Sequence, residues 1–146
     1  MPRLFTLQEA EELLPSVERW LQAAMESKTQ AGRLEGELTG VLTRIQQLGG
    51  VQIDVRRVAE AKSARERFLE RLRQSLGEIE NSGCLVKDLE TGLVDFPTLL
   101  DGDEVCLCWK LGEANIGYWH HTSEGFAGRK SIDPEFLQRH KGGRPH

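Results

Sequence analysis

Hydrophobic residues recur at alternating steps of three and four through the first third of the chain, the spacing of an amphipathic helix or a coiled coil. The stripe comprises Ala10, Leu14, Val17, Leu21, Ala24, Ala31, Leu38, Leu42 and Ile45. Thr6 followed by Glu9 predicts a capping box at the helix start, and the glycine pair at 49–50 predicts its end. Because Pro15 falls inside the pattern, we expect a short helix over 7–14 kinked into a longer one.

A second stripe predicts a second helix from about Asp54, an N-cap residue, to Ser82, with Gly83 as the stop. It comprises Val55, Val58, Ala61, Arg65, Phe68, Leu72, Leu76 and Ile79. The short link between the stripes makes the helices antiparallel, so residues 1–82 are predicted to form a helical hairpin. Two helices alone leave part of each stripe uncovered, and we therefore expect a homodimer in which four helices share a core.

From residue 83 onward the pattern changes to short apolar runs separated by turn residues. The predicted strands cover residues 83–88, 93–96, 105–111 and 116–121, with Pro97 ending the second. Turns at this spacing with no helical segment between them are typical of an antiparallel meander of three or four strands, here over 83–130. A short helix begun by Asp133-Pro134 and a disordered tail complete residues 131–146. The fold class is α+β.

Composition narrows the kinds of protein that this chain could be. The chain has 146 residues and a formal net charge of -4, with 6% aromatic residues, which favours one domain and argues against a nucleic-acid binder. No apolar run is long enough for a membrane span or a signal peptide, so we expect a cytoplasmic protein. Residues 56–73 carry seven basic and three acidic side chains, interleaved as on a solvated helix face.

The three cysteines, Cys84, Cys106 and Cys108, are an odd number, which argues against a disulfide framework. Cys106 and Cys108 are two apart on one predicted strand and share a sheet face. They are interpreted as core residues, since free cysteine behaves as a small buried hydrophobe. The alternative is a zinc site completed by His120 or His121.

Charged residues of the second half form the other candidate site. Asp95 lies between Val94 and Phe96 in an apolar strand, where an unpaired charge is costly. It is therefore predicted to pair, with Lys87 or Arg129, or to ligate something. The candidate ligand-binding residues are Lys87, Asp88, Asp95, Glu113, His120 and Arg129, and the metal candidates among them are Asp88, Asp95, Glu113 and His120. Carboxylates with an imidazole suit a divalent metal or acid–base chemistry, whereas structural ion pairs are the alternative.

Two glycine features are also open to two interpretations. Gly32, Gly36 and Gly40 form a stripe on the first helix, either where a partner backbone approaches closely or where the helix is soft. The loop over 125–129, ending in Arg129, is either a structural turn or a nest for a small anion.

The second half carries distinctive runs: GCLVKDLETGLVDFP at 83–97, CWKLGE at 108–113, GYWH at 117–120 and GFAGR at 125–129. With these runs the chain resembles a bacterial domain-of-unknown-function family over nearly its whole length, to about residue 130. The resemblance implies no activity or cofactor, but it marks the six charged candidates as members of the family signature.

Two functions follow from these patterns. The first is a non-enzymatic scaffold or interaction module that self-associates through its helices, favoured because no nucleophile–base pair or familiar metal motif is present. The alternative is a divalent-metal or small-anion binding protein, with hydrolysis as its chemistry and a carboxylate/histidine site in the second half.

Overall fold

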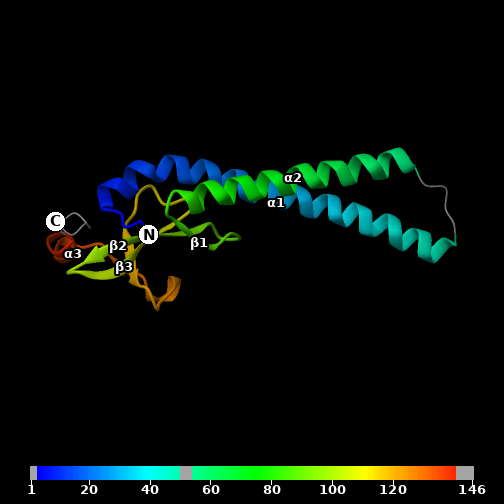
Figure 1. Cartoon of the computed structure of the whole chain (residues 1–146). Coiled ribbons are helices and arrows are strands. Elements are labelled where there is room, and N and C mark those ends of the chain that lie inside the picture. The colour runs from blue at the N-terminus through cyan, green and yellow to red at the C-terminus, as the bar shows by residue number, and fades with distance from the viewer. Residues whose placement is uncertain (1–2, 50–53, 141–146) are drawn as a thin grey trace. The chain divides into compact units, whose positions relative to one another are not determined.

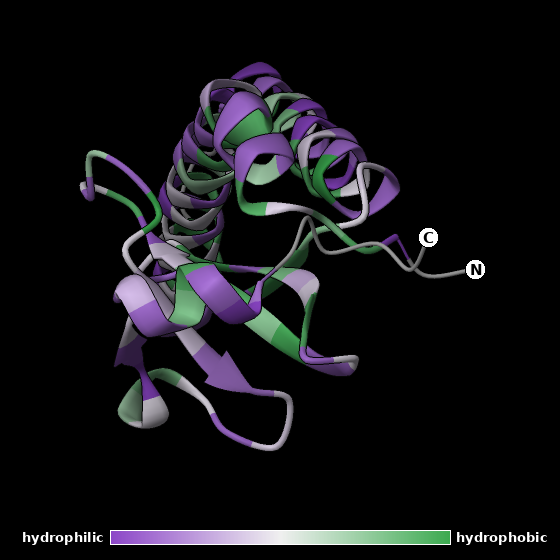
Figure 2. Cartoon of the chain, turned by 90° about the vertical axis from the view of Figure 1, so that its left-hand side faces the viewer, coloured by the Kyte–Doolittle hydropathy of each residue, from purple (hydrophilic) through white to green (hydrophobic). Residues whose placement is uncertain are grey.

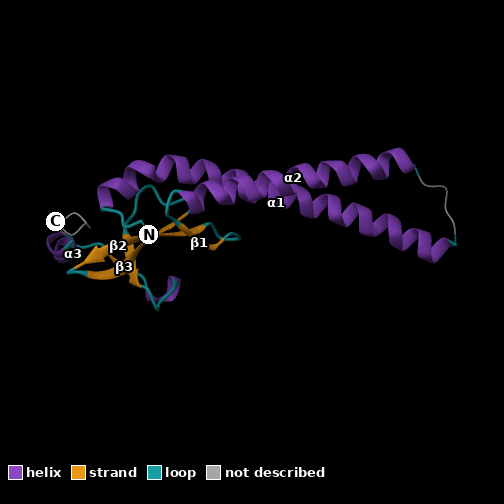
Figure 3. Cartoon of the chain, in the orientation of Figure 1, coloured by secondary structure: helices purple, strands orange, loops and turns teal. Residues whose placement is uncertain are grey.

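The computed structural model describes residues 3–49 and 54–140, and it has the expected α+β class (Figures 1 and 3). The elements are α1 (Leu7–Leu48), α2 (Val55–Asn81), β1 (Leu85–Asp88), β2 (Leu93–Leu100), β3 (Asp103–Lys110), β4 (Tyr118–His121), the 3-10 turn η1 (Phe126–Gly128), β5 (Lys130–Ser131) and α3 (Pro134–Arg139). The disorder expected at 141–146 and the second glycine of the 49–50 pair lie outside the described residues.

The predicted helix ends are confirmed by their hydrogen bonds. The Thr6 N–H donates to Glu9 Oε1 over 2.9 Å, and the Glu9 N–H donates to Thr6 Oγ1 over 3.0 Å, which completes the capping box. At the start of α2 the Arg57 N–H donates to Asp54 Oδ1. Gly83 follows α2 at a φ of 100°, a conformation that glycine adopts without a steric cost.

Pro15 lies inside α1, which continues unbroken from Leu7 to Leu48. The separate helix expected over 7–14 is therefore absent. Proline removes one backbone hydrogen bond from the ladder, but the flanking Leu14 and Val17 are both buried and hold the turns on either side against the same core.

The chain folds into two compact units, Met1–Leu21 with Leu76–His146, and Gln22–Ser75. In the second unit α1 and α2 run antiparallel as the predicted hairpin, and Arg65 of α2 pairs with Glu35 of α1 over 2.6 Å. Hydrophobic residues occupy short stretches between hydrophilic ones along the helix ribbons, as an amphipathic stripe requires (Figure 2). No helix in the described ranges carries an apolar stretch long enough to cross a membrane.

The first unit contains one antiparallel sheet with the strands in sequence order, so the predicted meander is confirmed. It has five strands rather than three or four, because the two-residue β5 pairs with β4. The prediction that Pro97 ends the second strand is wrong: β2 continues to Leu100. The Pro97 carbonyl accepts from the Phe5 N–H, on the side of β2 away from β3, so the missing Pro97 N–H costs no bond to β3.

The two faces of β2 have different neighbours. On one face Phe96 packs edge-on against Phe5, with ring centroids 5.4 Å apart, and the Thr98 hydroxyl donates to the Phe5 carbonyl. Side chains alternate across a strand, so Asp95 and Pro97 belong to the opposite face. The pairing register places Cys106 of β3 opposite Pro97, and His120 of β4 opposite Cys106. The alternation therefore brings an acid, a thiol and an imidazole to one face of three neighbouring strands.

Candidate functional site

The structure divides the six predicted site residues into separate groups. Asp95 lies against His120, Glu113 lies against Arg129, and Lys87 and Asp88 are exposed on β1. The Asp88 carboxylate accepts from the Glu90 N–H over 2.9 Å, which is a local turn contact. Of the predicted residues, Asp95 and His120 are therefore the pair that the fold buries completely.

The partner of Asp95 is His120, so the predicted pairing with Lys87 or Arg129 is wrong. The distance from Oδ1 of Asp95 to Nε2 of His120 is 3.0 Å, and the two side chains are 0% and 1% exposed. Nδ1 of His120 lies 2.7 Å from the His121 carbonyl, which can only accept, so Nδ1 carries a hydrogen. Nε2 then faces a carboxylate oxygen, and that contact is favourable only with a proton or a cation between the two atoms.

Cys106 adds a third donor to this pair. One oxygen of Asp95, the Cys106 sulfur and a ring nitrogen of His120 all lie within 4.8 Å of one another. Oδ2 of Asp95 is buried and makes no hydrogen bond to any described residue. The weak donor across the strand pair from Asp95 is the Cys108 thiol, whose pKa is raised to about 12 by its burial and by the Asp95 charge. The arrangement leaves a buried acceptor unsatisfied at a cluster of ligand-type atoms.

Arg129 forms a structural ion pair with Glu113. Its guanidinium donates to Glu113 Oε1 over 2.6 Å and to the Cys108 carbonyl over 3.1 Å, and it lies 4.1 Å from the Tyr118 ring centroid. Burial by itself would lower the pKa of Arg129, but the hydrogen bond to Glu113 and the nearby negative groups raise it. The contacts support the structural-turn interpretation of the 125–129 loop, since its cation already has an acidic partner.

All three cysteines are free and buried, as predicted for core residues. Burial raises the pKa of Cys84 to about 11, against smaller lowering effects of Ser82 and Arg3. Because the thiolate is the reactive form, we expect none of the three thiols to react with a disulfide reagent in the native protein at pH 8. Absorbance of the released chromophore should report three thiols after unfolding. A fast native reaction in wild type that is absent in Cys84→Ser would contradict the buried position of Cys84.

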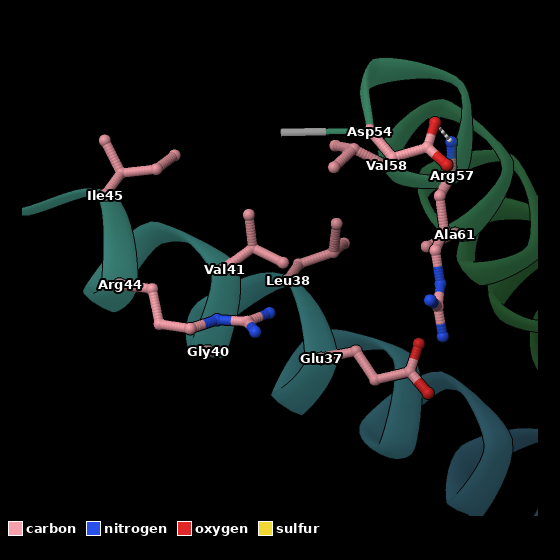
Figure 4. Close-up of a pocket in the computed structure, with 10 residues that line it drawn as sticks. All are labelled: Glu37, Leu38, Gly40, Val41, Arg44, Ile45, Asp54, Arg57, Val58 and Ala61. Carbon is pink, nitrogen blue, oxygen red and sulfur yellow. Dashed lines mark hydrogen bonds between the residues drawn. The ribbon is translucent and has the colours of Figure 1, made fainter. Parts of the chain in front are cut away.

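The hairpin unit contains a groove of about 740 Å³ between α1 and α2. It is lined by Glu37, Leu38, Gly40, Val41, Arg44, Ile45, Asp54, Arg57, Val58 and Ala61. Figure 4 shows Leu38, Val41 and Ile45 along α1, with Val58 and Ala61 on α2. The groove is therefore apolar inside, with charged side chains from both helices among its lining residues.

The glycine stripe has no close neighbour within this chain. A Cβ added at Gly32, Gly36 or Gly40 would meet nothing within 4 Å, apart from the helix's own backbone. The helix continues through all three positions, so the stripe does not interrupt α1.

His140 is a buried residue that no sequence pattern indicates. Its Nε2 accepts from the Leu7 N–H over 3.0 Å, and its Nδ1 lies 2.9 Å from the Leu99 carbonyl. It thereby satisfies a backbone donor at the start of α1 and connects α3 to β2. A single histidine near the end of the chain carries no periodic signal, so only the tertiary contacts identify it.

Comparison with known proteins gives one family. Residues 3–132 match the model of the family described as "Uncharacterized conserved protein (DUF2203)", which covers both helices of the hairpin and all five strands. No curated protein and no solved structure matches the chain. The predicted resemblance to a domain-of-unknown-function family is confirmed. The chain belongs to the DUF2203 family of uncharacterised conserved proteins.

Proposed function

We propose that this protein is a self-associating scaffold, in which the Gln22–Ser75 hairpin pairs with the same hairpin of a second copy. The observation that carries the proposal is the lack of a core in the far part of this unit. Over residues 35–49 and 54–74 no side chain is buried, although the apolar stripes continue. Leu42, Leu48 and Val55 are 56%, 66% and 75% exposed. An amphipathic helix gains most of its stability by burying its apolar face, and here that face lacks a cover.

The charges of the groove favour a second copy of this chain as the cover. The lining includes two acids, Glu37 and Asp54, and two bases, Arg44 and Arg57. Glu37 already pairs with Arg33 over 2.9 Å, whereas within the described ranges neither Arg44 nor Arg57 makes an ion pair. In a two-fold symmetric dimer the same surface of each copy faces the other, rotated by 180°. A surface that carries both acidic and basic side chains can therefore pair its acids with the bases of the second copy.

The test is the oligomeric state of wild type and of one groove variant. Ile45→Glu puts a charge into the apolar groove on both copies, so the dissociation constant should rise at least about 10-fold, because each 1.4 kcal/mol of lost binding energy is a factor of ten. Light scattering coupled to size exclusion over micromolar concentrations should report twice the chain mass for wild type and the single mass for the variant. Circular dichroism should keep its helical signal.

Gln46→Glu is the matched control, because it adds the same charge at the next residue, which is exposed and outside the groove. It should keep the wild-type mass. A wild-type protein that is monomeric throughout this range would overturn the proposal. Equal effects of the two substitutions on the measured mass would show that the groove is not part of the interface.

A further inference from the structure

We propose that Asp95, Cys106 and His120 form a binding site for a divalent transition-metal cation, with zinc as the preferred ion. The three side chains come from β2, β3 and β4 and present an oxygen, a sulfur and a nitrogen within 4.8 Å of one another. The site lies on the sheet face opposite to the one on which Phe96 contacts Phe5. It is independent of the self-association proposed for the hairpin.

The donor set selects the class of ion. Thiolate and imidazole with one carboxylate are ligands of zinc and of related borderline-soft ions. Calcium and magnesium take oxygen ligands, and this group offers oxygen only from Asp95. Three protein ligands leave the fourth position of a tetrahedral zinc ion open for water or a small molecule.

The histidine already has the orientation that a metal ligand needs. Its Nδ1 contacts the His121 carbonyl over 2.7 Å, which fixes the ring and directs Nε2 at Asp95. Nε2 lies 3.0 Å from Asp95 Oδ1, a contact that needs a proton between the two atoms in the metal-free protein, and a bound cation would displace that proton and take its place. A backbone carbonyl on the second ring nitrogen is the usual support of a zinc-bound histidine.

Asp95 supplies the second, independent observation. The side chain is 0% exposed, yet Oδ2 has no hydrogen-bond partner among the residues described. A buried carboxylate oxygen without a partner is costly, and coordination of a cation would satisfy it. The three positions are fixed by strand register, with His120 directly opposite Cys106. The ligands therefore sit on paired strands, which hold a coordination geometry more precisely than loops do.

The experiment uses the untagged full chain, first stripped with a chelator and then titrated with Zn²⁺ or Co²⁺. Elemental analysis after gel filtration should find one ion per chain, and the melting temperature should rise with added zinc. The cobalt form should show the near-ultraviolet absorption of a cobalt–thiolate bond. Cys106→Ser should abolish that absorption, and Asp95→Asn should weaken zinc binding at least roughly 10- to 100-fold, the cost of disturbing even an outer-shell partner.

Cys84→Ser is the matched control, since Cys84 is an equally buried free thiol outside the cluster. It should leave the cobalt absorption and the zinc stoichiometry unchanged. The inference is overturned if stripped wild type binds no stoichiometric metal and keeps its melting temperature in excess zinc. It is also overturned if Cys106→Ser retains the cobalt–thiolate absorption, since the sulfur ligand would then be another cysteine.

Discussion

His120→Leu should destabilise the metal-free protein by about 3–5 kcal/mol, because it leaves the Asp95 carboxylate buried without its partner. Asp95 is 0% exposed and its Oδ2 makes no hydrogen bond to a described residue, so without the imidazole the carboxylate would keep only weak thiol donors such as Cys108. The loss is a large share of the about 5–15 kcal/mol that a domain of this kind has in total. Urea unfolding with a chelator present, followed by far-ultraviolet circular dichroism, measures it.

The neighbouring histidine supplies the control. His121 is exposed, and His121→Leu should change the unfolding free energy by no more than about 0.5 kcal/mol. The double variant Asp95→Asn with His120→Leu should lose less than the sum of the two single losses, since the second substitution removes the unpaired charge. Equal effects of His120→Leu and His121→Leu would contradict a stabilising contact between Asp95 and His120.

Phe5→Ala should destabilise the sheet unit by about 3–5 kcal/mol, the usual cost of deleting a buried aromatic ring. Phe5 is fully buried, packs edge-on against Phe96, and carries the Arg3 guanidinium 4.2 Å above its ring centroid. The Phe5 backbone also forms hydrogen bonds with Pro97 and Thr98 of β2. The ring and the backbone of Phe5 therefore both hold the segment that leads into α1 against β2. The same urea titration applies, and the midpoint should fall without a change of slope.

Phe126→Ala is the matched control for ring deletion. Phe126 is 50% exposed and its ring contacts the side chains of Arg129 and Lys110, so its loss should cost about 1 kcal/mol or less. If Phe5→Ala cost no more than Phe126→Ala, the N-terminal segment would not be part of the core of this unit.

Local patterns predicted the elements because their signals repeat along the chain. The capping residues Thr6 and Glu9, the cap at Asp54 and the stop at Gly83 act within a few residues, and all four behave as predicted. Pro97 shows the limit of such local reasoning. A proline has no N–H to donate, but whether that matters depends on which side of the strand the next strand lies, and this is a tertiary fact.

The candidate site was predicted only in part for the same reason. The sequence indicates that Asp95 needs a partner, because its apolar neighbours bury it. It does not indicate the partner, since His120 is 25 residues away and the distance depends on the register of two strand pairs. Cys106 is buried, as predicted, and the strand register places it beside an acid and an imidazole, a neighbourhood that the cysteine spacing alone does not indicate.

The sequence by itself determined the hairpin, the antiparallel meander and the family, because periodicity, capping and turn residues act over short distances. Only the tertiary structure decided that Asp95 pairs with His120 and that Arg129 pairs with Glu113. It also decided that His140 accepts a hydrogen bond from the Leu7 N–H at the start of α1. Each of these contacts joins positions whose separation in space is set by strand register and helix packing. A side chain's chemistry can be read from the sequence, but its partner depends on which surfaces the whole fold brings together.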